Sequence, residues 1–222
     1  MTLIIVEVWF RSSNMSMPPV TLVKVPWPEG ESGNWCTSLR PAREAGKLID
    51  IALVFGRDSS YRKIYAHKIV LISYSAYFEA LLTGESSAHG GGYQEVKMGK
   101  EETDFHSVEM IVACLYSGEL PLSLLNVCSV IHTANLLKLS AIGKAACDFL
   151  INLLEPSIVC KMLRYAAVHA GCGDHVCDLY TRCADYLIDH IQECSLEPSY
   201  AELSNEEIVY AFTLSPKGRR FL

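Results

Sequence analysis

The hydrophobic pattern of the chain changes its period near residue 105, and this change restricts the possible folds more than any other feature. Before it, apolar runs of strand length occur at 51–55, 61–67 and 93–98. After it, apolar residues recur every three or four positions, which is typical of amphipathic helices. Strands mixed with helices and then followed only by helices indicate a small α+β domain continued by an all-α region.

The first 35 residues differ in composition from the rest of the chain. Residues 3–10 and 20–25 are apolar and β-branched enough for two short strands, but prolines and glycines lie between and after them. This pattern favours an irregular N-terminal arm over residues 1–35. The alternative is a strand that is added to another sheet.

A short helix is expected at 36–47. It would carry Leu39, Ala42 and Leu48 on one side, and Pro41 fits only its first turn. That apolar side has nothing to cover it in the helix itself, so a second copy of the chain is a natural partner.

The next segments predict a β-hairpin, one helix and a third strand. The hairpin joins residues 51–55 to 61–67 through five turn-forming residues, and the helix covers 69–82. A glycine- and serine-rich loop at 84–92 precedes the strand at 93–98.

The remainder predicts helices that are joined by short connectors and therefore lie antiparallel. Helix starts are marked by Pro156, by an Asp174 cap, and by a capping box that begins at Ser204. The apolar stripes lie at 105–116, 124–134, 142–153, 158–169 and 176–191.

Several of these segments, in this order, resemble the BTB/POZ domain, a small mixed sheet flanked by helical hairpins. The family places an Asp before its first strand, Ala-His-Arg/Lys after its second, and Ser-x-Tyr-Phe on the following helix. The matching segments are Ile49–Val54, Tyr65–Lys68, Leu71–Phe78, Glu95–Met98 and Leu115–Leu120. Residues 155–195 resemble the BACK domain that follows BTB in kelch-like proteins.

The resemblance implies an irregular arm at 1–35, a BTB/POZ domain at 36–154 and a partial BACK domain at 155–222. It also implies a non-enzymatic adaptor that forms homodimers or heterodimers through its BTB domain. The implied dimer interface consists of Leu39, Ala42, Leu48, Asp50, Lys68, Val70, Leu71 and Tyr74. Asp50 and Lys68 fall where the family has a charged pair near the dimer axis.

Many BTB proteins bind a cullin-3 scaffold and bring a substrate protein to a cullin-RING ubiquitin ligase. The sequence does not identify a substrate for this chain. The resemblance assigns the cullin contact to Phe78, Glu85 and Tyr116. However, residues 83–89 carry glycine and serines where the family has an apolar anchor. The alternative is a regulator that heterodimerises with full-length relatives or acts in transcriptional repression.

The sequence ends at Leu222 without a repeat period or a kelch-blade pattern. We therefore expect either a fragment or short isoform of a longer protein, or a chain that works without its own substrate-reading domain.

Catalytic, metal and cofactor sites are not expected. His169, Cys172, His175, Cys177, Cys183, His190 and Cys194 crowd together, but no Cys-x2-Cys pair occurs and several fall on an apolar stripe, so core packing is favoured over zinc. Gly90–Gly92 lacks the Gly-Lys-Ser/Thr of a phosphate loop. His67 is favoured as a hydrogen-bonded structural histidine over a general base.

Composition indicates which kinds of partner are disfavoured and in which cellular compartment the protein is expected. The 19 basic and 25 acidic residues give a net charge of −6, which disfavours nucleic acid, and no apolar run is long enough to span a membrane. The nine cysteines are an odd number, and most of them are scattered over apolar helix faces. They favour a reducing compartment, the cytoplasm or the nucleus.

Overall fold

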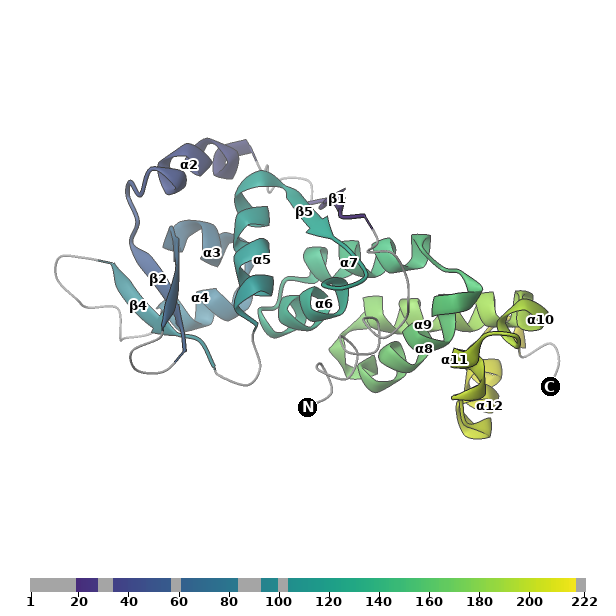
Figure 1. Ribbon diagram of the computed structural model, residues 1–222. Coiled ribbons are helices and arrows are strands. Elements are labelled where there is room, and N and C mark those ends of the chain that lie inside the picture. The colour runs from purple at the N-terminus through teal and green to yellow at the C-terminus, as the bar shows by residue number, and fades with distance from the viewer. Residues whose placement is uncertain (1–18, 28–33, 57–60, 84–92, 100–103, 219–222) are drawn as a thin grey trace. The chain divides into compact units, whose positions relative to one another are not determined.

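The computed structural model describes residues 19–27, 34–56, 61–83, 93–99 and 104–218 (Figure 1). The chain divides into two compact units, residues 1–145 and residues 146–222, which are treated separately below. None of the helices within the described ranges is long and apolar enough to cross a membrane.

The centre of the first unit is a three-stranded sheet in the order β3-β2-β4. Strand β2 (Ile51–Phe55) pairs antiparallel with β3 (Arg62–Ala66) and parallel with β4 (Gln94–Lys97). All five residues of β2 are buried, as expected for a central apolar strand. The predicted hairpin and third strand are therefore confirmed.

The first unit also contains helices, of which α5 (Phe105–Ser117) contacts β3 of this sheet. The further helices are α2 (Asn34–Glu44), α3 (Lys68–Tyr74), α4 (Ala76–Thr83) and α6 (Val127–Leu136). In Figure 1, α5 lies beside α2 and α3, and it contacts both of them. Pro41 lies inside α2 and not in its first turn, contrary to the expectation.

The prediction of a single helix at 69–82 is wrong, because the chain breaks at Ser75. This residue is extended, with φ −130° and ψ 110°. Its hydroxyl donates to the carbonyl of Leu137 at 2.6 Å and accepts from the amide of Phe78 at 3.1 Å. Ser75 thus caps α4 and ties it to a residue 62 positions away.

Part of the N-terminal segment forms a strand that pairs with another part of the chain, which was the alternative to an irregular arm. Strand β1 (Thr21–Lys24) pairs antiparallel with β5 (Glu119–Leu122), with Thr21 opposite Leu122 and Lys24 opposite Glu119. Gly118, in the left-handed conformation with φ 73°, ends α5 and turns the chain into β5. The other predicted strand, 3–10, and the loop at 84–92 lie outside the described residues.

The second unit is helical, and α8 (Pro156–Val168) packs along α9 (Asp174–Asp189). The division between the units falls within α7 (Ser140–Asn152). A 3-10 turn (Ala170–Cys172) joins α8 to α9, and α10 (Ile191–Cys194), α11 (Pro198–Ala201) and α12 (Asn205–Leu214) follow. Pro156 starts α8 as predicted, and Ser204 and Glu207 form the predicted capping box.

Asp174 does not cap α9, because the N-cap residue is Gly173, with φ 116°. A left-handed φ favours glycine, so the chain turns one residue earlier than the side-chain pattern suggested. Asp174 instead lies in the first turn of the helix, where its charge suits the helix dipole.

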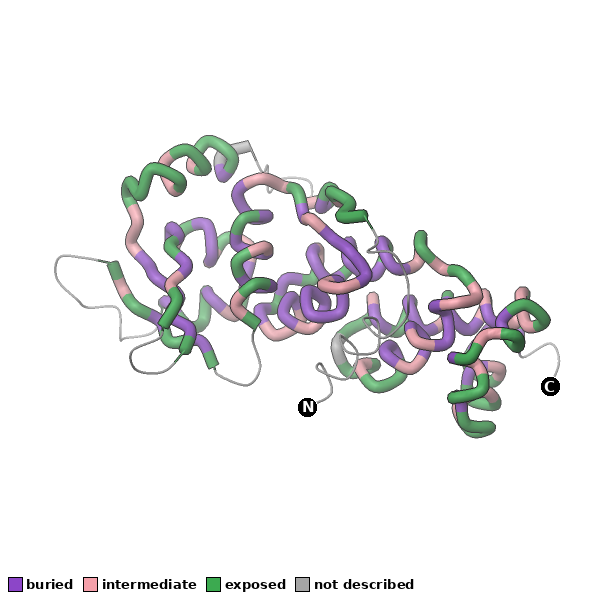
Figure 2. The backbone as a smooth tube through the Cα atoms, viewed as in Figure 1, coloured by how far each residue is buried: buried purple, intermediate pink, exposed green. Residues whose placement is uncertain are grey.

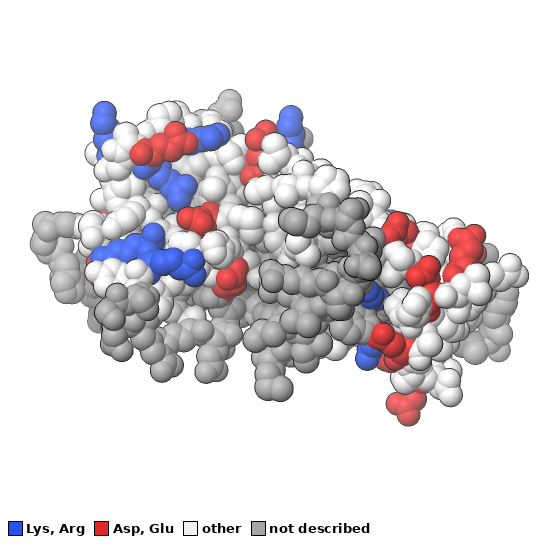
Figure 3. All heavy atoms as spheres, viewed as in Figure 1, with Lys and Arg blue, Asp and Glu red and all other residues white. Residues whose placement is uncertain are grey.

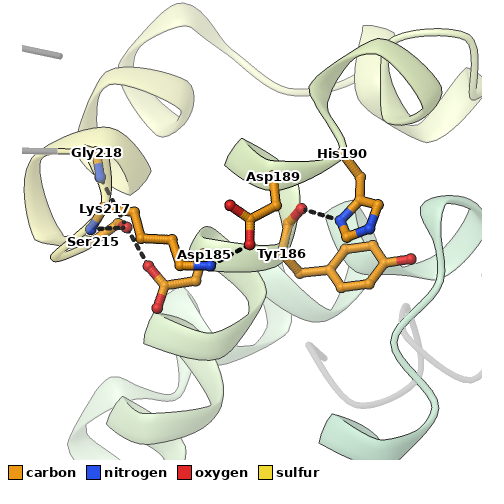
Figure 4. A network of polar contacts seen from close by, with 7 residues as sticks. All are labelled: Asp185, Tyr186, Asp189, His190, Ser215, Lys217 and Gly218. Atoms are coloured by element: carbon orange, nitrogen blue, oxygen red, sulfur yellow. Dashed lines mark hydrogen bonds and ion pairs between the residues drawn. The ribbon is translucent and has the colours of Figure 1, made fainter. Parts of the chain in front are cut away.

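A network of polar contacts attaches the segment after α12 to α9 (Figure 4). The hydroxyl of Ser215 donates to the carboxylate of Asp185 and accepts from the amides of Lys217 and Gly218, both at 3.1 Å. The ammonium of Lys217 pairs with Asp189. These contacts fix the end of α12 on the second unit.

Candidate functional site

Helix α2 is held on the first unit by one arginine and one buried cysteine. Cys36 is fully buried, and Arg43 donates from Nε to the carbonyl of Tyr65 at 2.9 Å. The guanidinium of Arg43 also lies 5.1 Å from the centroid of the Tyr116 ring. The predicted interface residues Leu39 and Ala42 are half-buried on this helix.

The segment after α2 is attached to the start of α3 by two hydrogen bonds. The carbonyl of Lys47 accepts from Nε2 of His67 at 3.0 Å, and Asp50 Oδ1 accepts from the amide of Lys68 at 2.7 Å. Asp50 therefore caps α3. Between the described side chains of Asp50 and Lys68 there is no ion pair, so the two residues meet through the backbone amide.

His67 is a structural residue, as predicted. A carbonyl can only accept, so the bond to Lys47 places the proton on Nε2 and leaves Nδ1 as an acceptor. The hydroxyl of Tyr116 donates to that Nδ1 and accepts from the amide of His67, each at 2.9 Å. Burial raises the pKa of Tyr116, which keeps the hydroxyl protonated as a donor.

Two large apolar side chains remain exposed where these segments meet. Leu48 is 78% exposed and Ile69 is 51% exposed. Leu48 also has φ 58°, a left-handed conformation that is unusual for a leucine. We call this pair, together with the half-buried Leu39 and Ala42 of α2, the Leu48 surface.

The structure brings only part of the predicted dimer interface to the surface. Val70 and Leu71 are fully buried within the chain itself, which corrects the expectation that they face a partner. Tyr74 is half-buried, and its ring packs against Trp27 with a centroid distance of 4.5 Å. Asp50 and Lys68 are half-buried at the start of α3.

The predicted cullin contacts are also mainly internal. Phe78 and Tyr116 are among the largest fully buried side chains of the described chain, so neither offers surface to a partner. Glu85 lies outside the described residues. On α4 the accessible side chains include those of Glu79 and Leu81, which are exposed, and of Tyr77, which is half-buried.

Ile69 is the interface candidate that sequence reasoning missed. It belongs to the run Ile69-Val70-Leu71-Ile72, in which every position is apolar. Such a run has no polar face to show which residues point inward. The available signal was the predicted start of the helix at residue 69, because residues of a first turn are frequently exposed on one side.

Most of the described cysteines are buried. Cys36, Cys114, Cys128, Cys147, Cys160, Cys183 and Cys194 are free and buried, as the sequence predicted, whereas Cys177 is exposed. Burial raises the pKa of Cys114 to about 12 and that of Cys160 to about 11. Such thiols stay protonated at neutral pH and act as small apolar groups.

The surface charges differ between the units. On the face drawn in Figure 3, Lys and Arg side chains gather over α2 and the β2-β3-β4 sheet. Over the second unit, Asp and Glu side chains predominate on this face. In Figure 2, buried and exposed residues alternate along most helices, so these helices have one buried and one exposed side. Among the described residues, no three His, Cys, Asp or Glu side chains cluster closely enough to hold a metal ion.

Comparison with known proteins assigns residues 39–154 to the BTB/POZ domain. The chain is 33% identical to Kelch-like protein 5 of Homo sapiens over 162 residues, 73% of this chain and 20% of that protein. It is 30% identical to Kelch-like protein 28 of Homo sapiens over 166 residues, 75% of this chain and 27% of that protein. For Kelch-like protein 17 of Mus musculus the identity is 27% over 167 residues, 75% of this chain and 24% of that protein.

The chain thus spans about a quarter of the length of these relatives. The alignments are longer than the stretch assigned to the BTB/POZ domain, which covers just over half of the chain. The order of strands and helices, the Asp50 cap and the His67–Tyr116 pair all lie within that stretch. The chain belongs to the BTB/POZ domain family.

Proposed function

We propose that this protein is a non-enzymatic adaptor that homodimerises through the Leu48 surface and brings other proteins together. The observation that carries this proposal is Leu48, an exposed leucine in a left-handed backbone conformation. Exposed apolar area and backbone strain are both unfavourable in a single chain, and each is common at interaction sites.

The hydrogen bonds beneath Leu48 support the proposal. They hold residues 47–50 against α3, so Leu48 and Ile69 are presented on a rigid base and lose little freedom on binding. Burying one leucine or isoleucine side chain yields about 1.5–3 kcal/mol. In a two-fold dimer each such gain is made twice, because the same patch is used by both copies.

The proposed partner of the dimer is a cullin scaffold, as in many members of the family, and the proposed outcome is transfer of ubiquitin to a recruited protein. The accessible side chains of α4, Tyr77 and Leu81, are the proposed contact in place of the buried Phe78 and Tyr116. The reducing cytoplasm or nucleus is the proposed compartment, in keeping with the free cysteines.

We also propose that residues 155–222 form part of a BACK domain. Two observations support this: the antiparallel pair α8–α9, and the alignments with Kelch-like proteins, which extend beyond the BTB/POZ stretch. The recruited substrate protein would then be bound by a region outside residues 155–222, in this protein or in a partner.

A second function is favoured by the burial of Phe78 and Tyr116, since both side chains assigned to the cullin contact are internal. In this alternative the chain heterodimerises with longer relatives and titrates them, or acts in transcriptional repression. The Leu48 surface serves the same purpose in both functions.

A pull-down with purified cullin-3 separates the two. The adaptor function predicts stoichiometric binding by the wild-type chain and loss of binding by Leu81→Asp, with the buried-core control Leu82→Met unaffected. No binding, together with exchange of subunits with a longer BTB protein, would replace the first function by the second.

A further inference from the structure

The two edges of the β3-β2-β4 sheet differ: a side chain of α2 bonds to the β3 edge, whereas the outward backbone groups of Glu95 and Lys97 at the β4 edge have no partner among the described residues. At the β3 edge, Arg43 covers the carbonyl of Tyr65. At the β4 edge, Gln94 and Met98 donate their amides inward, to Asp50 and Val54 of the β2 segment, each at 2.9 Å. Successive residues of a strand direct their backbone groups to opposite edges, so those of Glu95 and Lys97 point outward.

The residues in and beside β4 that precede Val96 are complementary in charge and size to those that follow it. The outer face of β4 carries Glu95 and Lys97, both exposed, one residue to either side of the buried Val96. Tyr93, which is 41% exposed, and Gly99 lie three residues to either side. If a second copy is related to the first by a 180° rotation about Val96, Glu95 faces Lys97 and Tyr93 faces Gly99 of that copy.

We propose that two copies of this chain pair antiparallel through β4, with the two-fold axis at Val96, and so join two sheets into one. Glu95 of one copy lies opposite Lys97 of the second copy, and each facing pair exchanges two backbone hydrogen bonds. Tyr93 covers Gly99 of the second copy, a cross-strand pairing that compensates for the missing side chain of an edge glycine.

Charge selects this register over its neighbours. If the axis passed through Glu95, two carboxylates would face each other, and an axis at Lys97 would bring two ammonium groups together; like charges directly opposite are destabilising. Lys63 pairs with Glu95 within the chain, while Lys97 makes no ion pair with any described side chain. The second copy supplies Lys97 with its carboxylate, and Glu95 then lies between two cations.

This interface is distinct from the Leu48 surface and does not depend on it. Each is two-fold, and two different two-fold interfaces on one chain link dimers into a larger assembly, either a closed tetramer or an open row. A four-residue strand buries little area, so the pairing is weak and acts at high local concentration. The β4 edge therefore lets dimers cluster.

The experiment uses the full chain with Leu48→Asp, so that association through the Leu48 surface is removed. Sedimentation equilibrium at about 10–500 μM measures the remaining self-association. In that background, Lys97→Glu and Glu95→Lys each weaken association at least about tenfold, since both facing pairs become like-charged. An equimolar mixture of the two variants restores it, because every pair is again acid with base.

Lys97→Pro is the second variant, because it removes an outward amide without breaking a bond to β2. It also abolishes association, and thermal unfolding confirms that each variant is folded. Association that survives Lys97→Glu and Lys97→Pro, or that the mixture does not restore, would overturn the proposal. So would a Leu48→Asp chain that stays monomeric over the whole concentration range.

Discussion

The two units of this protein are held together in different ways. In the first, buried polar side chains join segments far apart in the sequence: His67 to Tyr116, Ser75 to Leu137, and Ser107 to Ser129. In the second, the interior of α8 and α9 is made of apolar side chains and thiols, and most long-range polar contacts lie at its surface, such as Arg164 with Glu202 and Glu207. The first unit therefore depends on a few hydrogen bonds, the second on packing.

This difference accords with the proposed placement of the dimer contact on the first unit. Buried hydrogen bonds fix one arrangement of neighbouring segments, because an unsatisfied polar group in the interior is costly. Such bonds hold the residues beneath Leu48 in place. A helical unit held by packing tolerates change more readily and serves as a support.

The largest expected effect comes from Tyr116→Phe. The change removes one hydroxyl and leaves both the amide and Nδ1 of His67 without a partner. Two buried groups that each cost roughly 1–3 kcal/mol when unsatisfied give a loss of about 3 kcal/mol, measured by urea unfolding.

The matched control in the second unit is Tyr186→Phe. The ring of Tyr186 stacks on His190 with a centroid distance of 4.1 Å, and phenylalanine keeps that contact. A change within about 0.5 kcal/mol is expected. Equal losses for the two substitutions would remove the distinction between the units.

Ser75→Ala is the next test. It deletes the cap of α4 and a hydrogen bond to Leu137, both in the interior, for an expected loss of about 2 kcal/mol. Ser73→Ala, two residues earlier, deletes only an exposed hydroxyl that donates within its own helix, to Ile69. Its effect on unfolding should be within about 0.5 kcal/mol.

Cys183→Ser examines the packing of the second unit. Burial raises the pKa of this thiol well above its usual range, which marks a site that does not favour polar groups. Serine puts a polar hydroxyl in this apolar interior, where it can share only a carbonyl of its own helix, so a loss of about 1.5 kcal/mol is expected. The exposed Cys177→Ser should be neutral, and a neutral result for Cys183→Ser as well would show that this interior is loosely packed.

The smallest effect belongs to the surface contacts of the second unit. Burial raises the pKa of Glu207, but its hydrogen bonds to Ser204 and the nearby Arg164 outweigh this, so the pKa is lowered. Its stabilising effect is therefore present at neutral pH and is lost as the pH falls below about 4.5. Glu207→Ala should cost about 0.7 kcal/mol at pH 7 and flatten this acid dependence, whereas Glu207→Gln keeps the capping box and loses less.

Features that depend on residues close in sequence could be predicted, whereas features that depend on distant residues could not. Periodicity located α5, α8 and α9, and the capping box of α12, because these depend on residues close in the chain. It missed the break at Ser75, whose partner Leu137 is 62 positions away. The resemblance to the BTB/POZ family placed Val70 and Leu71 at the interface, and periodicity could not correct this, since the apolar run that contains them has no polar face.

The central claim is that the Leu48 surface joins two copies of the chain. Sedimentation equilibrium at about 1–20 μM tests it, in a range where proteins that form stable dimers are dimeric. The account predicts a dimer for the wild type and a folded monomer for Leu48→Asp, because aspartate tolerates the left-handed conformation and only the apolar contact is lost. Leu196→Asp, at a leucine of the second unit that is 85% exposed, should remain a dimer. A wild-type chain that is folded and monomeric over this range would contradict the account.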